Sequence, residues 1–207
     1  MTATPSPLRT RLQVSLLALL FFLPFFGAYF AVFVMGWQPG GERVNYGELV
    51  HPARPVPVFS LLTVDGAPHP VDALRGKWTL VQLLRGGCDD ACRRELVLSR
   101  QTRTALNDKR ERVQRVVIAD AVTDLGAIRS QLGADHPDLT WLRDAQLGTK
   151  AMDFFAGIPA HALLLVDPNG NWMMWYPAAK PDQDAIQRDF KGLQKDINKL
   201  LRLSSIG

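Results

Sequence analysis

Cysteine is scarce in this chain, since Cys88 and Cys92 are the only two among 207 residues. Two cysteines are too few for a disulfide-built scaffold, so the fold must depend on burial of apolar side chains, which make up 47% of the sequence. The sequence also lacks the C-x-x-C-H motif of haem attachment, the G-x-x-x-x-G-K-[ST] phosphate loop and the H-E-x-x-H zinc motif. These absences exclude the enzyme classes that depend on those motifs.

A large excess of charge of one sign is also missing from the C-terminal part of the chain. The formal net charge is +4, and residues 1–41 carry Arg9 and Arg11 but no acidic residue. The remainder holds 22 basic and 20 acidic residues. Because this part is nearly neutral, the sequence predicts no nucleic-acid partner.

No charged residue occurs in residues 12–41, and residues 14–35 are almost wholly apolar. About 20 such residues cross a bilayer as a helix, so we predict a single transmembrane anchor over residues 12–37, with Trp37 at the interface. A cleaved signal peptide is the alternative. The length of the apolar run and the lack of a small-x-small cleavage pattern after it argue against a cleaved peptide.

The charges that flank the anchor predict its orientation. Arg9 and Arg11 lie in the short tail, residues 1–11, and positive residues favour the cytoplasmic side. We therefore expect a single-pass protein of the bacterial inner membrane with its C-terminal domain in the periplasm. A cysteine pair fits that location, because the periplasm permits disulfide chemistry.

Residues 38–57 are rich in proline and glycine and are predicted to be an extended linker. The domain is then expected over residues 58–207. It should begin with a β-hairpin over residues 58–71, turning at Asp65 and Gly66.

Strands and helices alternate after this hairpin. Apolar runs predict strands at residues 79–84, 113–119, 139–142, 160–166 and 172–176, and amphipathic patterns predict helices at residues 93–112, 124–133, 145–155 and 186–201. This order predicts an α/β sandwich around a mostly parallel sheet, closed by an antiparallel hairpin and a helix. The predicted fold is thioredoxin-like, with an N-terminal β-hairpin and a preceding transmembrane helix.

The cysteine pair lies where a buried strand, two glycines and the start of a helix meet. A spacing of four residues puts Cys88 and Cys92 on one face of a helix. The pair could form a reversible redox disulfide or bind a soft ion such as Cu(I). A static disulfide is the third possibility. The free N–H groups at a helix start would favour a thiolate, and we expect Cys88 to be the more exposed thiol.

A second informative stretch precedes the strand at residues 160–166. Pro159 stands where thioredoxin-like folds carry a cis-proline that faces the dithiol. His161 lies at the entry of the same strand, where it could be a third metal ligand or could protonate a thiol. A hydrogen-bonded histidine near the surface is the structural alternative.

Together these motifs resemble the Sco family. The resemblance rests on Cys88-x-x-x-Cys92, with Glu95 and Leu96 after it, and on the distal His161 before Leu-Val-Asp-Pro-x-Gly. Sco proteins are membrane-anchored, thioredoxin-like assembly factors of cytochrome c oxidase. The resemblance implies copper as a cofactor, bound by Cys88, Cys92 and His161, and oxidase subunits or assembly factors as partners.

The resemblance and the residues leave three classes of function open. The leading hypothesis is a non-enzymatic oxidase assembly factor that delivers copper or maintains the thiols of the copper site. The second is an enzyme, a periplasmic thiol–disulfide oxidoreductase, although C-x-x-x-C is not the usual C-x-x-C spacing of such enzymes. The third is a thioredoxin-like interaction module with a static disulfide.

Overall fold

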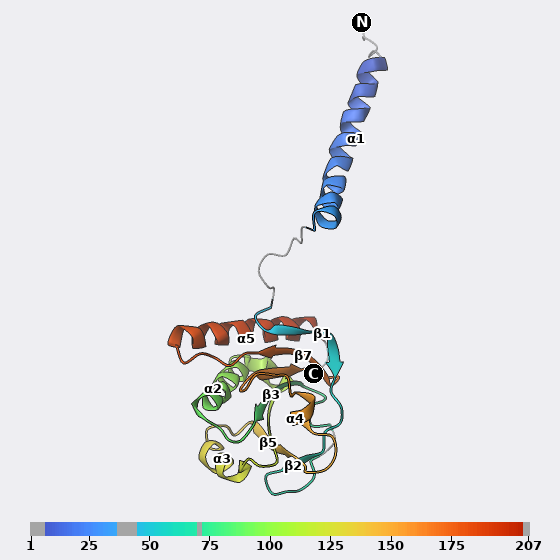
Figure 1. Ribbon diagram of the computed structural model, residues 1–207. Coiled ribbons are helices and arrows are strands. Elements are labelled where there is room, and N and C mark those ends of the chain that lie inside the picture. The colour runs from blue at the N-terminus through green and yellow to red at the C-terminus, as the bar shows by residue number, and fades with distance from the viewer. Residues whose placement is uncertain (1–6, 37–44, 70–71, 205–207) are drawn as a thin grey trace. The chain divides into compact units, whose positions relative to one another are not determined.

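The computed structural model describes residues 7–36, 45–69 and 72–204 of the chain (Figure 1). The chain divides into two compact units, Met1–Val44 and Asn45–Gly207. The predicted interfacial position of Trp37 lies outside the described residues, as do parts of the predicted tail and linker.

The first unit is an apolar helix. Helix α1 (Pro7–Tyr29) continues into a short π-helix, η1 (Phe30–Val34). The segment Arg11–Val34 has 24 residues and a mean hydropathy of 2.4, and within the described ranges it is the single helix long and apolar enough to cross a membrane. This helix fits the predicted single-pass anchor.

The second unit contains a seven-stranded sheet with the strand order β1-β7-β6-β3-β4-β5-β2. Its strands are β1 (Glu48–Pro55), β2 (Leu61–Thr63), β3 (Trp78–Leu84), β4 (Val113–Ala119), β5 (Leu139–Asp144), β6 (Leu163–Val166) and β7 (Asn171–Tyr176). Every residue of β3 is buried, as expected for a central strand that is covered on both faces.

The sheet is mixed, and the prediction of a mostly parallel sheet is wrong. Only β3, β4 and β5 run parallel to one another, whereas β6 runs antiparallel to β3, and β7, β1 and β2 are antiparallel to their neighbours. The two parallel pairs follow from the helical crossovers after β3 and β4. The loop after α4 returns the chain in the opposite direction, so the edge built from β6, β7 and β1 is antiparallel.

Helices cover both faces of the sheet. They are α2 (Asp90–Thr104), α3 (Leu125–Leu132), α4 (Ala151–Phe154) and α5 (Gln183–Leu203), with a 3-10 helix, η2 (Asn107–Arg112), between α2 and β4. Leu98 of α2 and Leu193 of α5 pack with Leu80 on one face. Phe155 packs with Val81 on the opposite face. The core thus lies on both sides of β3, and Figure 1 shows α5 along one side of the unit.

The predicted linker over residues 38–57 requires a correction, because it contains β1. This strand pairs antiparallel with β7, and its register shifts in the middle. Pro52 and Pro55 are tolerated there because β1 is an edge strand, where a missing N–H removes no ladder bond. The compact unit therefore starts at Asn45 and not at residue 58.

The predicted N-terminal hairpin is present in a short form. The N–H of Gly66 donates to the carbonyl of Thr63 at 2.9 Å and closes the turn. In the described part of the return limb, Pro68 forms an isolated bridge with Leu62. The main partner of β2 is β5, with which Leu61, Leu62 and Thr63 pair in antiparallel register.

The helix predicted at residues 145–155 is shortened to α4. The buried carboxylate of Asp144 accepts the N–H groups of Ala151 and Met152, each at 2.9 Å. Free N–H groups of this kind mark the start of a helix, so the helix begins only after the loop that follows β5.

Candidate functional site

The site is built where β3 ends and α2 begins. Gly86 and Gly87 have φ values of +77° and +142°, a conformation that side chains disfavour. The N–H of Gly86 donates to Asp120 Oδ2 and Thr123 Oγ1, each at 3.0 Å. These bonds fix the turn and bring Cys88 to the N-terminal end of α2.

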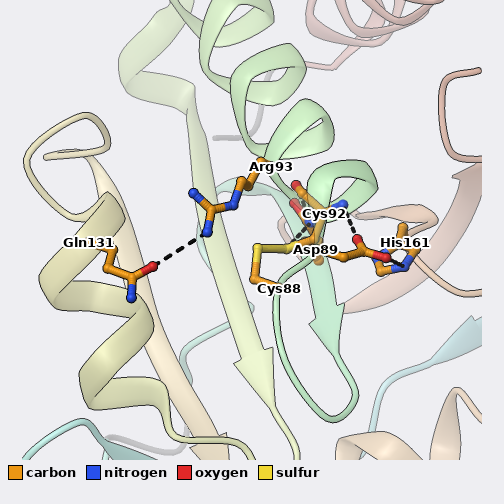
Figure 2. The surroundings of a disulfide bond; sticks show 7 residues. Cys88, Asp89, Cys92, Arg93, Gln131 and His161 are labelled. Carbon is orange, nitrogen blue, oxygen red and sulfur yellow. Dashed lines mark hydrogen bonds and ion pairs between the residues drawn. A yellow bond between two sulfur atoms is a disulfide. The ribbon is translucent and has the colours of Figure 1, made fainter. Parts of the chain in front are cut away.

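Cys88 and Cys92 form a disulfide, with their Cα atoms 5.1 Å apart (Figure 2). Cys88 is half-buried and precedes the helix, whereas the side chain of Cys92 lies in the first turn and is 0% exposed. The prediction that Cys88 is the more exposed thiol is confirmed. A second protein could therefore reach the sulfur of Cys88 but not that of Cys92.

Asp89, between the two cysteines, is the N-cap of α2. Its Oδ1 accepts the N–H of Cys92 at 2.9 Å, and its Oδ2 lies 3.3 Å from Nε2 of His161 (Figure 2). The hydrogen bond from Cys92, together with the nearby imidazole, holds the pKa of Asp89 below its usual range. The helix-start N–H of Cys92, which was expected to be free to stabilise a thiolate, is thus already bound to a carboxylate.

Two of the arginines near the dithiol are bound to other groups. Arg85 donates to the carbonyl of Phe155 at 2.9 Å, and Arg93 reaches across to Gln131 Oε1 on α3 at 3.4 Å (Figure 2). Arg85 thereby connects the glycine turn to the loop after α4. The electrostatic environment of the sulfurs therefore includes the ionised Asp89 as well as these cations.

The expectation of a cis-proline at Pro159 is wrong, because the peptide bond before this residue is trans. The chain turns just before β6, where the N–H of Ala162 donates to the carbonyl of Pro159 at 3.3 Å and His161 adopts a φ of +61°. This turn reverses the chain without a cis bond. It leaves Pro159 exposed and points His161 toward Asp89.

The predicted copper ligands Cys88, Cys92 and His161 are near one another in the fold but do not form a ligand set. Among the described residues, no group of three or more His, Cys, Asp and Glu side chains could hold a metal ion. The Asp89 carboxylate lies between the disulfide and the imidazole of His161 in Figure 2. In addition, the two sulfurs are bonded to each other, whereas metal binding requires thiolates. The arrangement of this oxidised state therefore does not fit a copper site.

Two buried polar side chains near Cys92 were not assigned a role from the sequence. Gln82 of β3 is 2% exposed, and its Nε2 lies 3.0 Å from the carbonyl oxygen and 3.4 Å from the sulfur of Cys92. Such an amide can stabilise a Cys92 thiolate. The sequence signal that could have identified it was the amide of Gln82 within the apolar run of residues 80–84.

Glu95 is the second of these residues and lies one helical turn after Cys92 on α2. It is 1% exposed, its Oε1 accepts the N–H of Ala179 at 2.6 Å, and its Oε2 is buried without a hydrogen-bond partner. Burial raises the pKa of Glu95 to about 7. A carboxyl group with this pKa can exchange a proton near neutral pH, and the spacing of three residues places it on the same side of the helix as Cys92.

The fold and the site together define the class of protein. A seven-stranded sheet carries a cysteine pair at the start of α2, and a candidate membrane-spanning helix precedes the domain. This is a thioredoxin-like protein with an N-terminal helix that could anchor it to a membrane. A family model described as "transmembrane-like, thioredoxin-like, C-terminal domain" matches residues 78–204, more than half of the chain, so the chain belongs to this family.

Solved structures agree with this fold. The solution structure of apo Sco1 from Thermus thermophilus is 16% identical, with a TM-score of 0.52, and the match covers 79% of this chain and 99% of that chain. A putative thiol:disulfide interchange protein DsbE from Chlorobium tepidum is 16% identical, with a TM-score of 0.56, covering 72% and 96%. No curated protein sequence matches the chain. At these identities the two structures support the thioredoxin-like fold but do not assign a function.

Proposed function

We propose that this protein is a membrane-anchored thiol–disulfide exchange protein that reduces a disulfide in a partner protein. The observation that carries the proposal is the asymmetric cysteine pair, with a half-buried Cys88 before α2 and a fully buried Cys92 within it. This asymmetry supplies one sulfur for attack on a partner and one for resolution. A static disulfide would need no such difference in access.

The exchange proceeds from the reduced state in two steps. The Cys88 thiolate attacks one sulfur of the partner's disulfide, forms a mixed disulfide and expels the partner's other sulfur as a thiolate. Cys92 then attacks the Cys88 sulfur, releases the partner as a dithiol and restores the Cys88–Cys92 disulfide. The partner gains two electrons, and a dithiol reductant must return the protein to its reduced form.

Gln82 and Glu95 support the second step. Cys92 must lose its proton before it attacks, and Glu95 is a buried carboxyl with a pKa near neutrality and one oxygen without a partner. The amide of Gln82, 3.4 Å from the Cys92 sulfur, then stabilises the thiolate. The ionised carboxylate of Asp89, next to Cys88 in the chain, opposes the stabilisation of a Cys88 thiolate by the helix start.

Cytochrome c oxidase is the partner that the Sco resemblance suggests. We propose more specifically that the protein acts in the bacterial periplasm, where it keeps the cysteines of the copper-receiving oxidase subunit reduced. The predicted anchor supports a role at a membrane, and the Sco-like pattern Cys88-x-x-x-Cys92 with Glu95 supports this choice of partner. We prefer thiol maintenance to copper delivery because His161 contacts Asp89 and does not join the two sulfurs.

Trapping of the mixed disulfide tests the proposal. The full chain with Cys92→Ser should accumulate a covalent adduct in cells that express the oxidase, visible on a non-reducing gel. The matched Cys88→Ser variant should give no such adduct, because the buried Cys92 is not accessible to a partner. Mass spectrometry should identify the copper-receiving oxidase subunit in the adduct. If neither variant forms an adduct, the exchange proposal is refuted. An adduct that contains only other proteins would refute the choice of oxidase alone.

A redox titration separates exchange from a static disulfide. Structural disulfides have reduction potentials below roughly −300 mV, whereas exposed exchange disulfides have higher values. We expect the Cys88–Cys92 pair of the full chain to equilibrate above that limit.

A further inference from the structure

Helix α5 presents a row of basic side chains to solvent that the proposed redox function does not use. Counted from Arg188, the basic residues follow at steps of three, four, four and three, which places them on one helix face. They are Arg188, Lys191, Lys195, Lys199 and Arg202, and we call them the basic face of α5. Lys199 is half-buried and the other four are exposed.

This basic face lies opposite the side of α5 that packs on the sheet. Leu193, Ile197 and Leu201 are almost fully buried in the core. Among the described residues, none of the five basic side chains forms an ion pair with an acidic group. The acidic residues of α5 are few: Asp184 lies in the first turn, Asp189 bonds to the Tyr46 hydroxyl, and Asp196 is buried. From Arg188 to Arg202, the charged side chains on the basic face of α5 are therefore all positive.

The start of the folded unit is docked beside the same face. Asp196 Oδ2 accepts the N–H groups of Tyr46 at 2.8 Å and Gly47 at 2.9 Å. The Nζ of Lys199, one of the basic residues, lies 3.5 Å from Asn45 Oδ1. Gly192 is required for this packing, since a Cβ there would lie 2.2 Å from the Tyr46 ring. The chain that comes from α1 thus enters the domain at the edge of the basic face.

The connection between α1 and this docked segment is short. Only residues 37–44 separate the described end of the first unit from Asn45, and eight residues span roughly 30 Å at full extension. If α1 crosses the membrane, this short connection keeps the docked residues 45–47 within about that distance of the end of the span. An unpaired basic helix face at such a point matches the negative charge of anionic lipids.

We propose that the basic face of α5 binds the headgroups of anionic phospholipids in the bilayer that α1 spans. This contact would hold α5 against the membrane. The proposal rests on the anchor and on α5, and is independent of the proposed thiol exchange.

The lysines themselves report the contact. The full chain is reconstituted in nanodiscs of phosphatidylcholine and, separately, of phosphatidylglycerol, and is treated briefly with an uncharged acetylating reagent. Mass spectrometry then gives the acetylation rate of each lysine. In the anionic lipid, Lys191, Lys195 and Lys199 should react at least about fivefold more slowly, the factor that corresponds to the free energy of one cation at an anionic surface. Lys150 should react equally in both lipids, and high salt should remove the difference.

Charge reversal provides the matched control. The double variant Lys191→Glu/Lys195→Glu should abolish the lipid-dependent protection of Lys199. The control double variant Arg129→Glu/Lys150→Glu should preserve this protection, because Arg129 lies on α3 and Lys150 directly precedes α4. Figure 1 shows α3 at the end of the unit that is remote from α5. All four substituted side chains lie at or near the surface, so both variants should fold. Equal acetylation rates in the two lipids overturn the proposal. If the three lysines react equally slowly in both lipids, the proposal fails as well, because a protein surface and not the lipid headgroups then covers them.

Discussion

Replacement of Glu95 by glutamine should change how the stability of the domain depends on pH. The pKa of Glu95 rises from 4.5, its ordinary value, to about 7, chiefly because the carboxyl is buried. Below pH 4.5 the group is protonated in both the folded and the unfolded chain and contributes no difference. Between pH 4.5 and about 7 the folded state binds more protons than the unfolded state, so the free energy of unfolding falls as the pH rises.

The size of this loss follows from the shift. One pKa unit corresponds to 1.36 kcal/mol, so a rise from 4.5 to about 7 corresponds to about 3 kcal/mol. Glu95→Gln keeps an oxygen for the N–H of Ala179 and cannot ionise. The variant should match the wild type at acid pH and exceed its stability by up to about 3 kcal/mol above pH 7.

Urea unfolding of the oxidised full chain in detergent, followed by tryptophan fluorescence, measures this difference across the pH range. Asp108→Asn, which removes a carboxylate from an exposed position in η2, controls for the loss of one negative charge. If the wild type and Glu95→Gln lose stability in parallel as the pH rises, Glu95 does not ionise with a raised pKa, and its proposed role in deprotonating Cys92 fails.

Four further predictions concern the cysteines, the histidine, the docked segment and the anchor. In the reduced chain, iodoacetamide should label Cys88 well before Cys92, which is 0% exposed; equal rates, measured by mass spectrometry, would remove the division of roles between them. His161→Ala should change the affinity of the reduced chain for Cu(I) by less than about tenfold, because two thiolates satisfy this ion; a larger loss in an anaerobic titration would make His161 a ligand. Gly192→Ala should lower the free energy of unfolding by at least about 1 kcal/mol, since its Cβ would lie 2.2 Å from the Tyr46 ring; an unchanged urea midpoint would show that Tyr46 is not docked there. A C-terminal alkaline phosphatase fusion should be active in cells, and activity of a cytoplasmic reporter instead would reverse the predicted orientation.

Local sequence patterns were sufficient to predict the framework of the fold. The apolar run before Gly86 predicted β3, since a strand buried on both faces needs no alternation. The residues 113–119 were predicted as a strand and form β4. The three- and four-residue steps from Ile186 to Leu201 predicted α5, because the buried face of a helix follows directly from helical periodicity. These features depend on side chains close in sequence.

The pairing of strands and the contacts of the site were decided by the tertiary structure. The prolines of β1 suggested a linker, yet an edge position beside β7 accepts them, and no local pattern shows which strand lies at an edge. The sequence left His161 open as a metal ligand, as a proton donor to a thiol or as a hydrogen-bonded histidine near the surface. Its position depends on the turn before β6, which brings the imidazole to Asp89, a residue 72 positions earlier in the chain.

The sequence by itself predicted that Cys88 and Cys92 lie together where a buried strand ends and a helix begins, because an apolar run, two glycines and a helix-compatible segment follow one another there. Only the tertiary structure showed that the amide of Gln82 contacts the sulfur of Cys92 and that Glu95, one helical turn further along α2, is buried. Burial is a property of the folded chain, and the raised pKa of Glu95 follows from burial. The place of the cysteine pair was therefore encoded locally, whereas the surroundings of Cys92 and the burial of Glu95 were decided by the packing of α2 on the sheet.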